Sequence, residues 1–237
     1  METSRKSRIE QRVLRLIADF EHYVNWYDVH VPFDRPDQLN SHLKTIQLRF
    51  ELKTAAAAAA DPDFRESLYR TLQSWGIGQR GSRLLSRTQF DGAIVSATPA
   101  IAKLDGVAIN YPSLDIDAIA AQLWAVLGTM KIVDNKAPLV PRTKALHHLL
   151  PDLVVPMDRE YTRTFFGWHA PEFQGHGRPD GQRSIFTKTF CELVQIARAT
   201  NPELYISAKR PWRTSRTKIL DNAIVGFCMA EGLQRPS

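Results

Sequence analysis

The sequence predicts an all-α protein made of two helical lobes with a cleft between them. Two observations support this class. Apolar residues recur three and four positions apart through most of the chain, and proline and glycine fall between these stretches. No two alternating segments are joined by a short turn, as a β-hairpin requires. The 237 residues suffice for one large domain or two small ones. We expect an N-terminal helical lobe over residues 1–112, a second lobe over 113–168, and C-terminal helices over 169–237 that complete the fold.

The first lobe contains the longest amphipathic patterns. Their apolar spacing predicts helices over residues 7–27 and 37–60, a helix that begins with Pro62, and short helices over 88–95 and 99–104. Proline is favoured at the first position of a helix because its fixed φ suits that position and no N–H is needed there.

The second half of the chain contains shorter predicted helices. One of them is led by Ser113, one spans 143–150 and one begins at Asp158. A fourth spans 184–199, and the last two begin at Pro202 and at Ser215. Residues 169–183 are rich in glycine and proline and predict a loop. Pro151 ends the helix before it, because proline lacks the N–H that would continue the hydrogen-bond ladder. Leu153, Val154 and Val155 then predict an extended link to Pro156 and Asp158.

Charge and cysteine content narrow the class of protein. The net charge is +6, and residues 136–218 contain fourteen basic and seven acidic residues, which accounts for the whole excess. A polyanion such as nucleic acid is the natural partner of such a surface, although a merely soluble basic face would have the same composition. Cys191 and Cys228 are the only cysteines, so a disulfide scaffold or a four-cysteine cluster is excluded, and a reducing cytoplasm is expected. No apolar run has the roughly 18 residues of a membrane helix.

One stretch of the second lobe resembles a known family. It reads LVPRTKA over 139–145, continues as a helix, and then reads VVPMDREYTRTFF over 154–166. This pattern resembles the helix–hairpin–helix DNA glycosylase superfamily, in which a hairpin opens a helix and an apolar link leads to a catalytic aspartate. Asp158 matches the position of that aspartate, and Arg163 follows it at the family's spacing. The resemblance covers about fifty residues and implies a DNA glycosylase that acts on double-stranded DNA.

The sequence departs from the family pattern at the hairpin. Pro141 replaces the glycine whose backbone N–H approaches a DNA phosphate, so a phosphate contact there must be made differently. Family members with lyase activity have a lysine at the position of Thr143, and Lys144 is its neighbour. One residue turns a side chain by about 100° on a helix, so we expect Lys144 to point away from the pocket and toward phosphate. The resemblance then implies a monofunctional glycosylase that leaves an abasic site.

The resemblance and the charge pattern together indicate three sets of site residues. Asp158 would be the catalytic carboxylate and Arg163 its positioning partner. The DNA contacts are expected from Val140, Arg142, Thr143, Lys144, Lys209, Arg210, Arg213 and Arg216. The pocket for the flipped base is expected from Trp26, Tyr27, Gln38 and His42, although core packing and a solvated helix face are the alternative roles of these side chains.

The chemistry of base removal fits a carboxylate. Breaking the N-glycosidic bond builds positive charge on the sugar, which an ionised Asp158 would stabilise while it orients water. The alternative role of Asp158 is to cap a helix N-terminus, and the alternative function is a non-catalytic helix–hairpin–helix DNA-binding module. No cofactor or obligate protein partner is expected. The excised base is undetermined: repair of damaged bases and defence against phages with modified DNA are both open, and we favour defence because the N-terminal lobe matches no repair branch.

Two metal-dependent functions find little support. Pro36-Asp37 and Glu51-Leu52-Lys53 spell part of a magnesium nuclease signature, but that signature belongs on strands and these residues lie in a helical pattern. His147 and His148 suggest zinc, but adjacent histidines on a helix point about 100° apart, and no cysteine or acidic cluster accompanies them. We therefore expect no metal site.

Overall fold

The computed structural model describes residues 2–30, 35–78, 83–134, 138–174 and 181–233. Within these ranges every regular element is helical, and Leu84 and Val133 form an isolated antiparallel bridge. The all-α prediction is therefore confirmed. The helices are α1 (Glu2–Ala18), α2 (Phe20–His30), α3 (Pro36–Glu51), α4 (Ala55–Ala60), α5 (Pro62–Ser74), α6 (Arg87–Ala102), α7 (Ile116–Thr129), α8 (Leu139–Leu149), α9 (Tyr161–Phe165), α10 (Ala170–Phe173), α11 (Gly181–Thr200), the 3₁₀ helix η1 (Pro202–Tyr205) and α12 (Arg216–Ala230).

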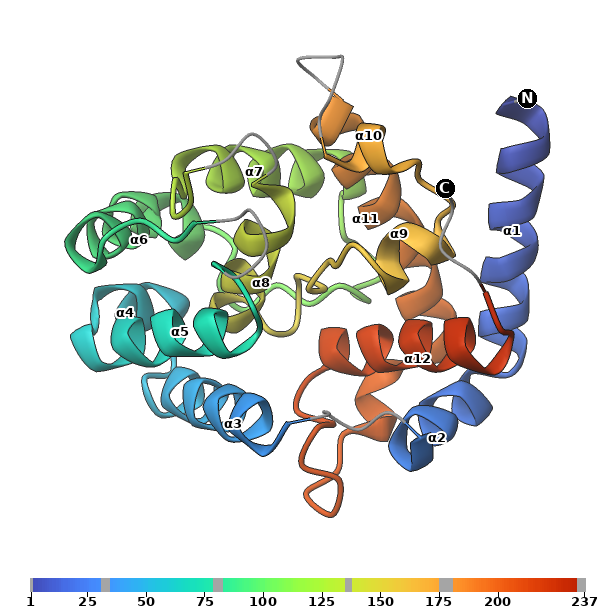
Figure 1. The fold of residues 1–237 in the computed structure, drawn as a ribbon, viewed down its shortest axis with the longest axis horizontal. Coiled ribbons are helices and arrows are strands. Elements are labelled where there is room, and N and C mark those ends of the chain that lie inside the picture. Colours follow the sequence, from blue (N-terminus) through green and yellow to red (C-terminus); the bar gives the residue numbers. More distant parts are fainter. Residues whose placement is uncertain (1, 31–34, 79–82, 135–137, 175–180, 234–237) are drawn as a thin grey trace.

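The helices form two groups on opposite sides of the molecule. Helices α3 to α6 lie on one side, and α1, α2 and α12 lie on the other (Figure 1). Helix α3 packs on α5, α4 packs on α6, and α2 packs along α12. Helices α7 and α11 connect the groups, because α7 contacts α6 and α11, and α11 contacts α1 and α12. Segments on either side of the boundaries predicted at residues 112 and 168 pack against each other, since the first two helices contact the last one. The buried apolar residues form one core cluster that includes both groups.

Two of the predicted long helices are broken. The predicted helix over 7–27 is divided at Asp19 into α1 and α2. The predicted helix over 37–60 is divided between α3 and α4, where Lys53 adopts a φ of 61° and Thr54 caps the N-terminus of α4 by accepting a hydrogen bond from the Ala57 N–H. A non-glycine residue at positive φ is uncommon and ends a right-handed helix. Apolar spacing alone missed these breaks, because the pattern continues on both sides of each turn.

In contrast, α6 is one helix where two short helices were predicted. It runs through Pro99, whose missing N–H removes a single hydrogen bond close to the C-terminal end of the helix. Ala97 and Ile101, on either side of Pro99, are fully buried. Burial of this face offsets the local cost of the proline.

The backbones of α2 and α12 approach each other closely at Gly226. A Cβ atom built on Gly226 would lie 2.1 Å from the carbonyl oxygen of Tyr23 and 3.3 Å from the backbone nitrogen of Tyr27. Glycine is therefore required where the two helices cross. This crossing brings the first turns of α12 next to the C-terminal half of α2. No helix in the described part of the chain combines the length and the apolar character needed to cross a membrane.

Candidate functional site

Asp158 lies at the start of α9, at the end of the buried extended link from Leu153 to Pro156. Its Oδ1 atom accepts hydrogen bonds from the backbone N–H groups of Glu160, at 2.7 Å, and Tyr161, at 2.5 Å. Its own N–H donates to Thr162 Oγ1 at 3.1 Å. The carboxylate therefore caps the first turn of α9, as proposed in its alternative role. The structure shows no hydrogen bond from a described residue to Oδ2, so a second oxygen of the same carboxylate remains for chemistry.

The surroundings of Asp158 favour its neutral form more than water does. Its pKa is raised, first because the carboxyl group is largely removed from solvent and second because Asp221 carries a like charge nearby. Lys144 and the two backbone N–H groups oppose this shift. A carboxyl group with a raised pKa accepts a proton more readily than an ordinary aspartate, which is what a general base requires.

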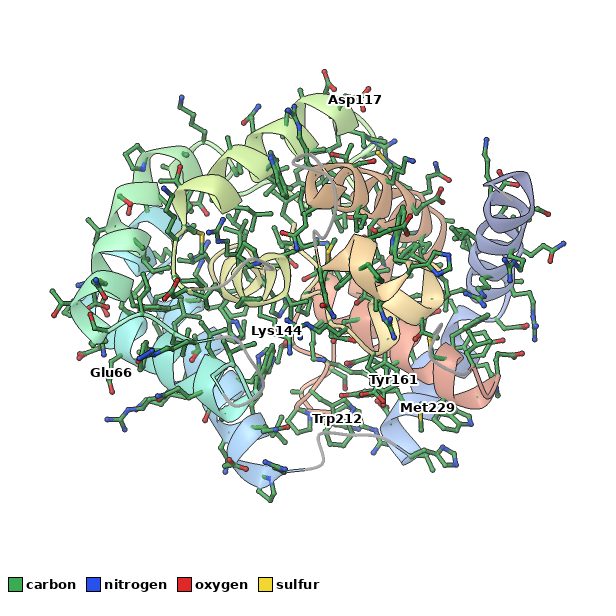
Figure 2. All side chains as sticks on the ribbon, turned by 45° about the horizontal axis from the view of Figure 1, so that its top comes forward. Glu66, Asp117, Lys144, Tyr161, Trp212 and Met229 are labelled. Carbon is green, nitrogen blue, oxygen red and sulfur yellow. The ribbon has the colours of Figure 1, made fainter. Side chains whose placement is uncertain are left out.

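Lys144 belongs to the same cluster. Its Nζ atom lies 5.3 Å from the centre of the Trp75 ring, a cation–π distance. Its pKa is lowered by burial, while the negative charges of Asp158 and Asp221 act in the opposite direction. We expected Lys144 to turn away from the acid; instead its side chain lies in the middle of the molecule in Figure 2, close enough to Asp158 to interact with it. The difference arises because the helix begins at Leu139, earlier than predicted, and packs with this face inward.

A buried ion pair completes the cluster behind these two residues. Lys218 Nζ lies 2.6 Å from Asp221 Oδ2, one turn apart on α12, and both side chains are buried. The ammonium group also lies 5.6 Å from the centre of the Tyr27 ring. The pKa of Lys218 is raised: burial lowers it, but the charge of Asp221, followed by Tyr27, outweighs that effect. Our sequence reasoning missed Asp221, although an acid three residues after a lysine within an apolar helix was a signal.

Arg163 was expected to position Asp158. It is buried, and its Nε atom donates to the carbonyl oxygen of Arg159 at 2.9 Å. The bonds that orient the Asp158 carboxylate come from backbone N–H groups. The role assigned to Arg163 stays a prediction.

The residues expected to touch DNA at the start of α8 face the protein interior. Thr143 is fully buried; its Oγ1 atom donates to the Val140 carbonyl and accepts from the Met157 N–H. Val140 is also buried. Arg142 donates through Nη1 to the Leu127 carbonyl at 2.8 Å, and burial lowers its pKa. These side chains fix α8 to its neighbours and do not form an exposed basic surface.

The basic tract before α12 divides into anchored and exposed residues. Arg213 forms an ion pair with the buried Asp28 at 2.7 Å, and its side chain is 11% exposed. The side chain of Arg210 is 53% exposed with a longer contact to Asp28, at 3.4 Å, and Lys209 is exposed as well. Arg216 pairs with Asp152 at 3.1 Å. Arg210, Arg213 and Arg216 each have a carboxylate partner, and Arg210 is the most exposed of the three. Lys209 and Arg210 are thus the members of this set with the most exposure to a phosphate.

The two aromatic residues expected in a base pocket point to different places. Trp26 is partly exposed and stacks on His30, with ring centres 4.1 Å apart. Tyr27 is buried beneath Lys218 and so belongs to the cluster around Asp158. Trp26 and Tyr27 are neighbours on α2 and turn by about 100° relative to each other, and here they lie against different groups.

The two polar candidates on α3 also differ. Gln38 is partly buried, and its Nε2 atom donates to the Ser74 carbonyl at 3.0 Å. His42 is fully buried, so the alternative of a solvated helix face is wrong for it. Its Nδ1 atom lies 3.0 Å from Nε2 of His148, and Trp75 packs against both rings. His42 lies beside the cluster rather than on a surface that could read a base.

Within the described ranges, no group of three or more histidine, cysteine, aspartate or glutamate side chains could hold a metal ion. The nuclease fragment also fails as a metal site. Asp37 and Glu51 lie fourteen residues apart on α3, which separates their backbones by about 21 Å along the helix axis.

The described site is therefore a group of two carboxylates and two ammonium groups on α8, α9 and α12, next to Trp75 and a set of buried histidines. Comparisons of the chain with protein-family models, with curated proteins and with solved structures gave no match. A function must therefore be argued from the geometry itself.

Proposed function

We propose that this protein is a monofunctional DNA glycosylase, which hydrolyses the N-glycosidic bond of a flipped base with Asp158 as the catalytic carboxylate. The observation that carries the proposal is the state of Asp158. One oxygen is fixed by two backbone N–H groups, the other has no hydrogen bond from a described residue, and a lysine lies close by. A carboxylate held in this way needs no rearrangement before it stabilises charge on a sugar or accepts a proton from water.

The residues around Asp158 fit defined roles in this reaction. The Lys144 ammonium group opposes the effect of Asp221 and so helps to keep Asp158 ionised. Burial lowers the pKa of Lys144, and the negative charges of Asp158 and Asp221 oppose this shift; we assign Lys144 as a cation, and trapping with borohydride tests whether it acts as a nucleophile instead. Lys209 and Arg210 supply exposed positive charge for the DNA backbone.

The test of this proposal is a comparison of base release by the wild-type protein and by Asp158→Asn. Asparagine keeps an oxygen at the position of Oδ1 for the α9 cap but removes the charge. We expect base release to fall by about 10²-fold or more, with DNA binding and melting temperature retained. Glu160→Gln, an exposed neighbour, is the matched control and should keep full activity. Equal activity of Asp158→Asn and wild type would remove Asp158 from the mechanism.

The substrate panel distinguishes the two biological roles. It should include duplexes with oxidised, alkylated and mismatched bases and phage DNA with glucosylated cytosines, each followed by detection of abasic sites. We propose modified phage DNA as the first substrate to try. Release only from oxidised or alkylated duplexes would assign the protein to repair.

A non-catalytic DNA-binding module is the second candidate, and the exposed basic tract supports it. This function predicts salt-dependent binding without base release from any duplex of the panel. In either case, the double change of Lys209 and Arg210 to alanine should lower the slope of log affinity against log salt by about 1 to 2, because Arg210 is exposed but also pairs with Asp28. Changing Arg213 to alanine should affect stability more than that slope, because its charge is already paired with Asp28.

A further inference from the structure

Three histidines are buried together at the junction of the two helix groups. His42 lies on α3, and His147 and His148 lie on α8; each is fully buried. The rings of His42 and His147 are stacked with centres 5.9 Å apart, and those of His42 and His148 are 5.1 Å apart. Trp75, which follows the last residue of α5, packs against His42 and His148, with ring centres 5.4 and 5.0 Å apart. A buried histidine normally stays neutral, because the charged ring loses its hydration.

The partners of these rings determine where each hydrogen lies. Nδ1 of His148 is 2.8 Å from the Lys144 carbonyl oxygen, which can only accept, so Nδ1 carries the hydrogen. Nε2 of the neutral ring is then an acceptor, and Nδ1 of His42 must donate to it across 3.0 Å. Nε2 of His42 is left to accept from the Thr214 hydroxyl at 3.1 Å. One directed chain therefore runs from Thr214 through His42 and His148 to the Lys144 carbonyl.

His147 is held in the same tautomer by different partners. Its Nδ1 lies 2.9 Å from the Val154 carbonyl oxygen and therefore donates. Thr217 Oγ1 is 3.0 Å from the same nitrogen and donates its own hydrogen to the Pro151 carbonyl. Nε2 of His147 is buried and has no hydrogen-bond partner among the described residues. It is an open acceptor for a proton in a place that disfavours charge.

The network joins elements that are distant in sequence. His42 and Thr214 link α3 to the tract before α12, and His147 and Thr217 link α8 to the first turn of α12. A proton added to His148 Nε2 would face the N–H of His42, so two donors would meet at 3.0 Å. Protonation therefore breaks the chain as well as placing a charge in the core.

The charged groups around the histidines oppose proton uptake. Lys218 of α12 acts against all three rings, and Lys144 of α8 acts against His148. Asp221 pairs with Lys218, and Asp158 interacts with Lys144. Burial is nevertheless the largest cause for each ring: it lowers the pKa of His42 and His147 well below the usual value and that of His148 to about 4.

We infer that His42, His147 and His148 form an acid-sensitive lock, which holds α3 and α8 to the start of α12 while the rings are neutral and releases them when the rings take up protons. The lock lies beside Lys144 and holds the end of the basic tract through Thr214. Its release would change the position of both relative to Asp158.

The test is the number of protons taken up on unfolding. Each histidine has a folded pKa below its unfolded value of about 6.5, so the unfolded chain binds more protons below that pH, and stability falls as pH falls. Each ring should raise the unfolding equilibrium constant about tenfold per pH unit between pH 6 and 5, which gives about 10³-fold for three. Urea unfolding of the full chain at pH 7.5, 6.0, 5.5 and 5.0 measures this slope.

Substitutions of single histidines test whether the protons taken up on unfolding bind to the three buried rings. His42→Gln and His148→Asn should each lower the slope by about one proton, whereas His22→Gln, an exposed histidine on α2, should leave it unchanged. If either buried variant does not fold, the ¹⁵N chemical shifts of the histidine rings in the wild-type protein provide the test. Three rings should remain Nδ1–H tautomers down to pH 5.5.

Hydrogen exchange separates local release from general loss of stability. After correction for the pH dependence of intrinsic exchange, we expect α3, α8 and the first turn of α12 to lose protection at pH 5 before α6 does. A proton slope near zero, or ring signals that titrate near pH 6.5 in the folded protein, would overturn the inference. Uniform loss of protection in all helices would overturn the release step.

Discussion

The crossing of α2 and α12 gives a stability prediction that can be worked out from the structure. In Gly226→Ala, the new Cβ would lie 2.1 Å from the Tyr23 carbonyl oxygen and 3.0 Å from the carbon of the same carbonyl. Real Cβ atoms do not approach closer than 3.0 Å, so the two helices must separate by about 1 Å. The obstructing atoms are backbone, and no rotamer change can relieve the contact.

The expected cost is the sum of two opposing effects. Overpacking of this kind costs about 3 kcal/mol, at the upper end of the usual range. Alanine gains about 1 kcal/mol over glycine in a helix interior. The net loss is about 2 kcal/mol, which lowers the melting temperature of a chain of this size by about 4–8 °C.

Gly92→Ala on α6 is the matched control, because nothing lies within 4 Å of its new Cβ. Only the gain in helix propensity applies there, so its melting temperature should rise by about 2–4 °C. Thermal unfolding followed by circular dichroism measures both variants. A Gly226→Ala protein as stable as the wild type, beside a control that behaves as expected, would refute the close approach of α2 and α12.

Two substitutions and one trapping experiment test other features of the protein. Arg49→Met should cost about 3–5 kcal/mol in urea unfolding, because it leaves Asp105 without its 2.8 Å ion-pair partner; an unchanged midpoint would contradict the burial of this pair. Asp28→Asn should speed trypsin cleavage after the exposed Lys209 at least tenfold, a local opening cost of about 1.4 kcal/mol, because the tract loses its anchoring charge. Borohydride added during base release should trap no covalent adduct with DNA; an adduct lost in Lys144→Ala would make that lysine a nucleophile.

The sequence alone determined the fold class and several local features. Helical spacing of apolar residues predicts helices wherever one face can be buried, and most helices of this chain have that spacing; α10 lies in the stretch that was predicted as a loop. Asp158 after Pro156 predicts a helix start, and Asp61 before Pro62 predicts another. Each depends on interactions within about four residues. The structure confirms the start at Pro62, whereas the helix after Asp158 begins three residues later, at Tyr161, whose N–H donates to the Asp158 carboxylate. The exact helix ends at Asp19 and Lys53 depend on tertiary packing, so spacing alone did not predict them.

Only the tertiary structure decided which charges share a site. Lys218 and Tyr27 are almost two hundred positions apart in the sequence, yet the α2–α12 crossing places one over the ring of the other. Arg213 is neutralised by Asp28 from α2, so it cannot be counted with the exposed cations of its own tract. His42 has the polar periodicity of a surface position, but it is fully buried against His148, Trp75 and Thr214. Burial and ion pairing between distant segments depend on how helices pack, and no local pattern in the chain encodes that.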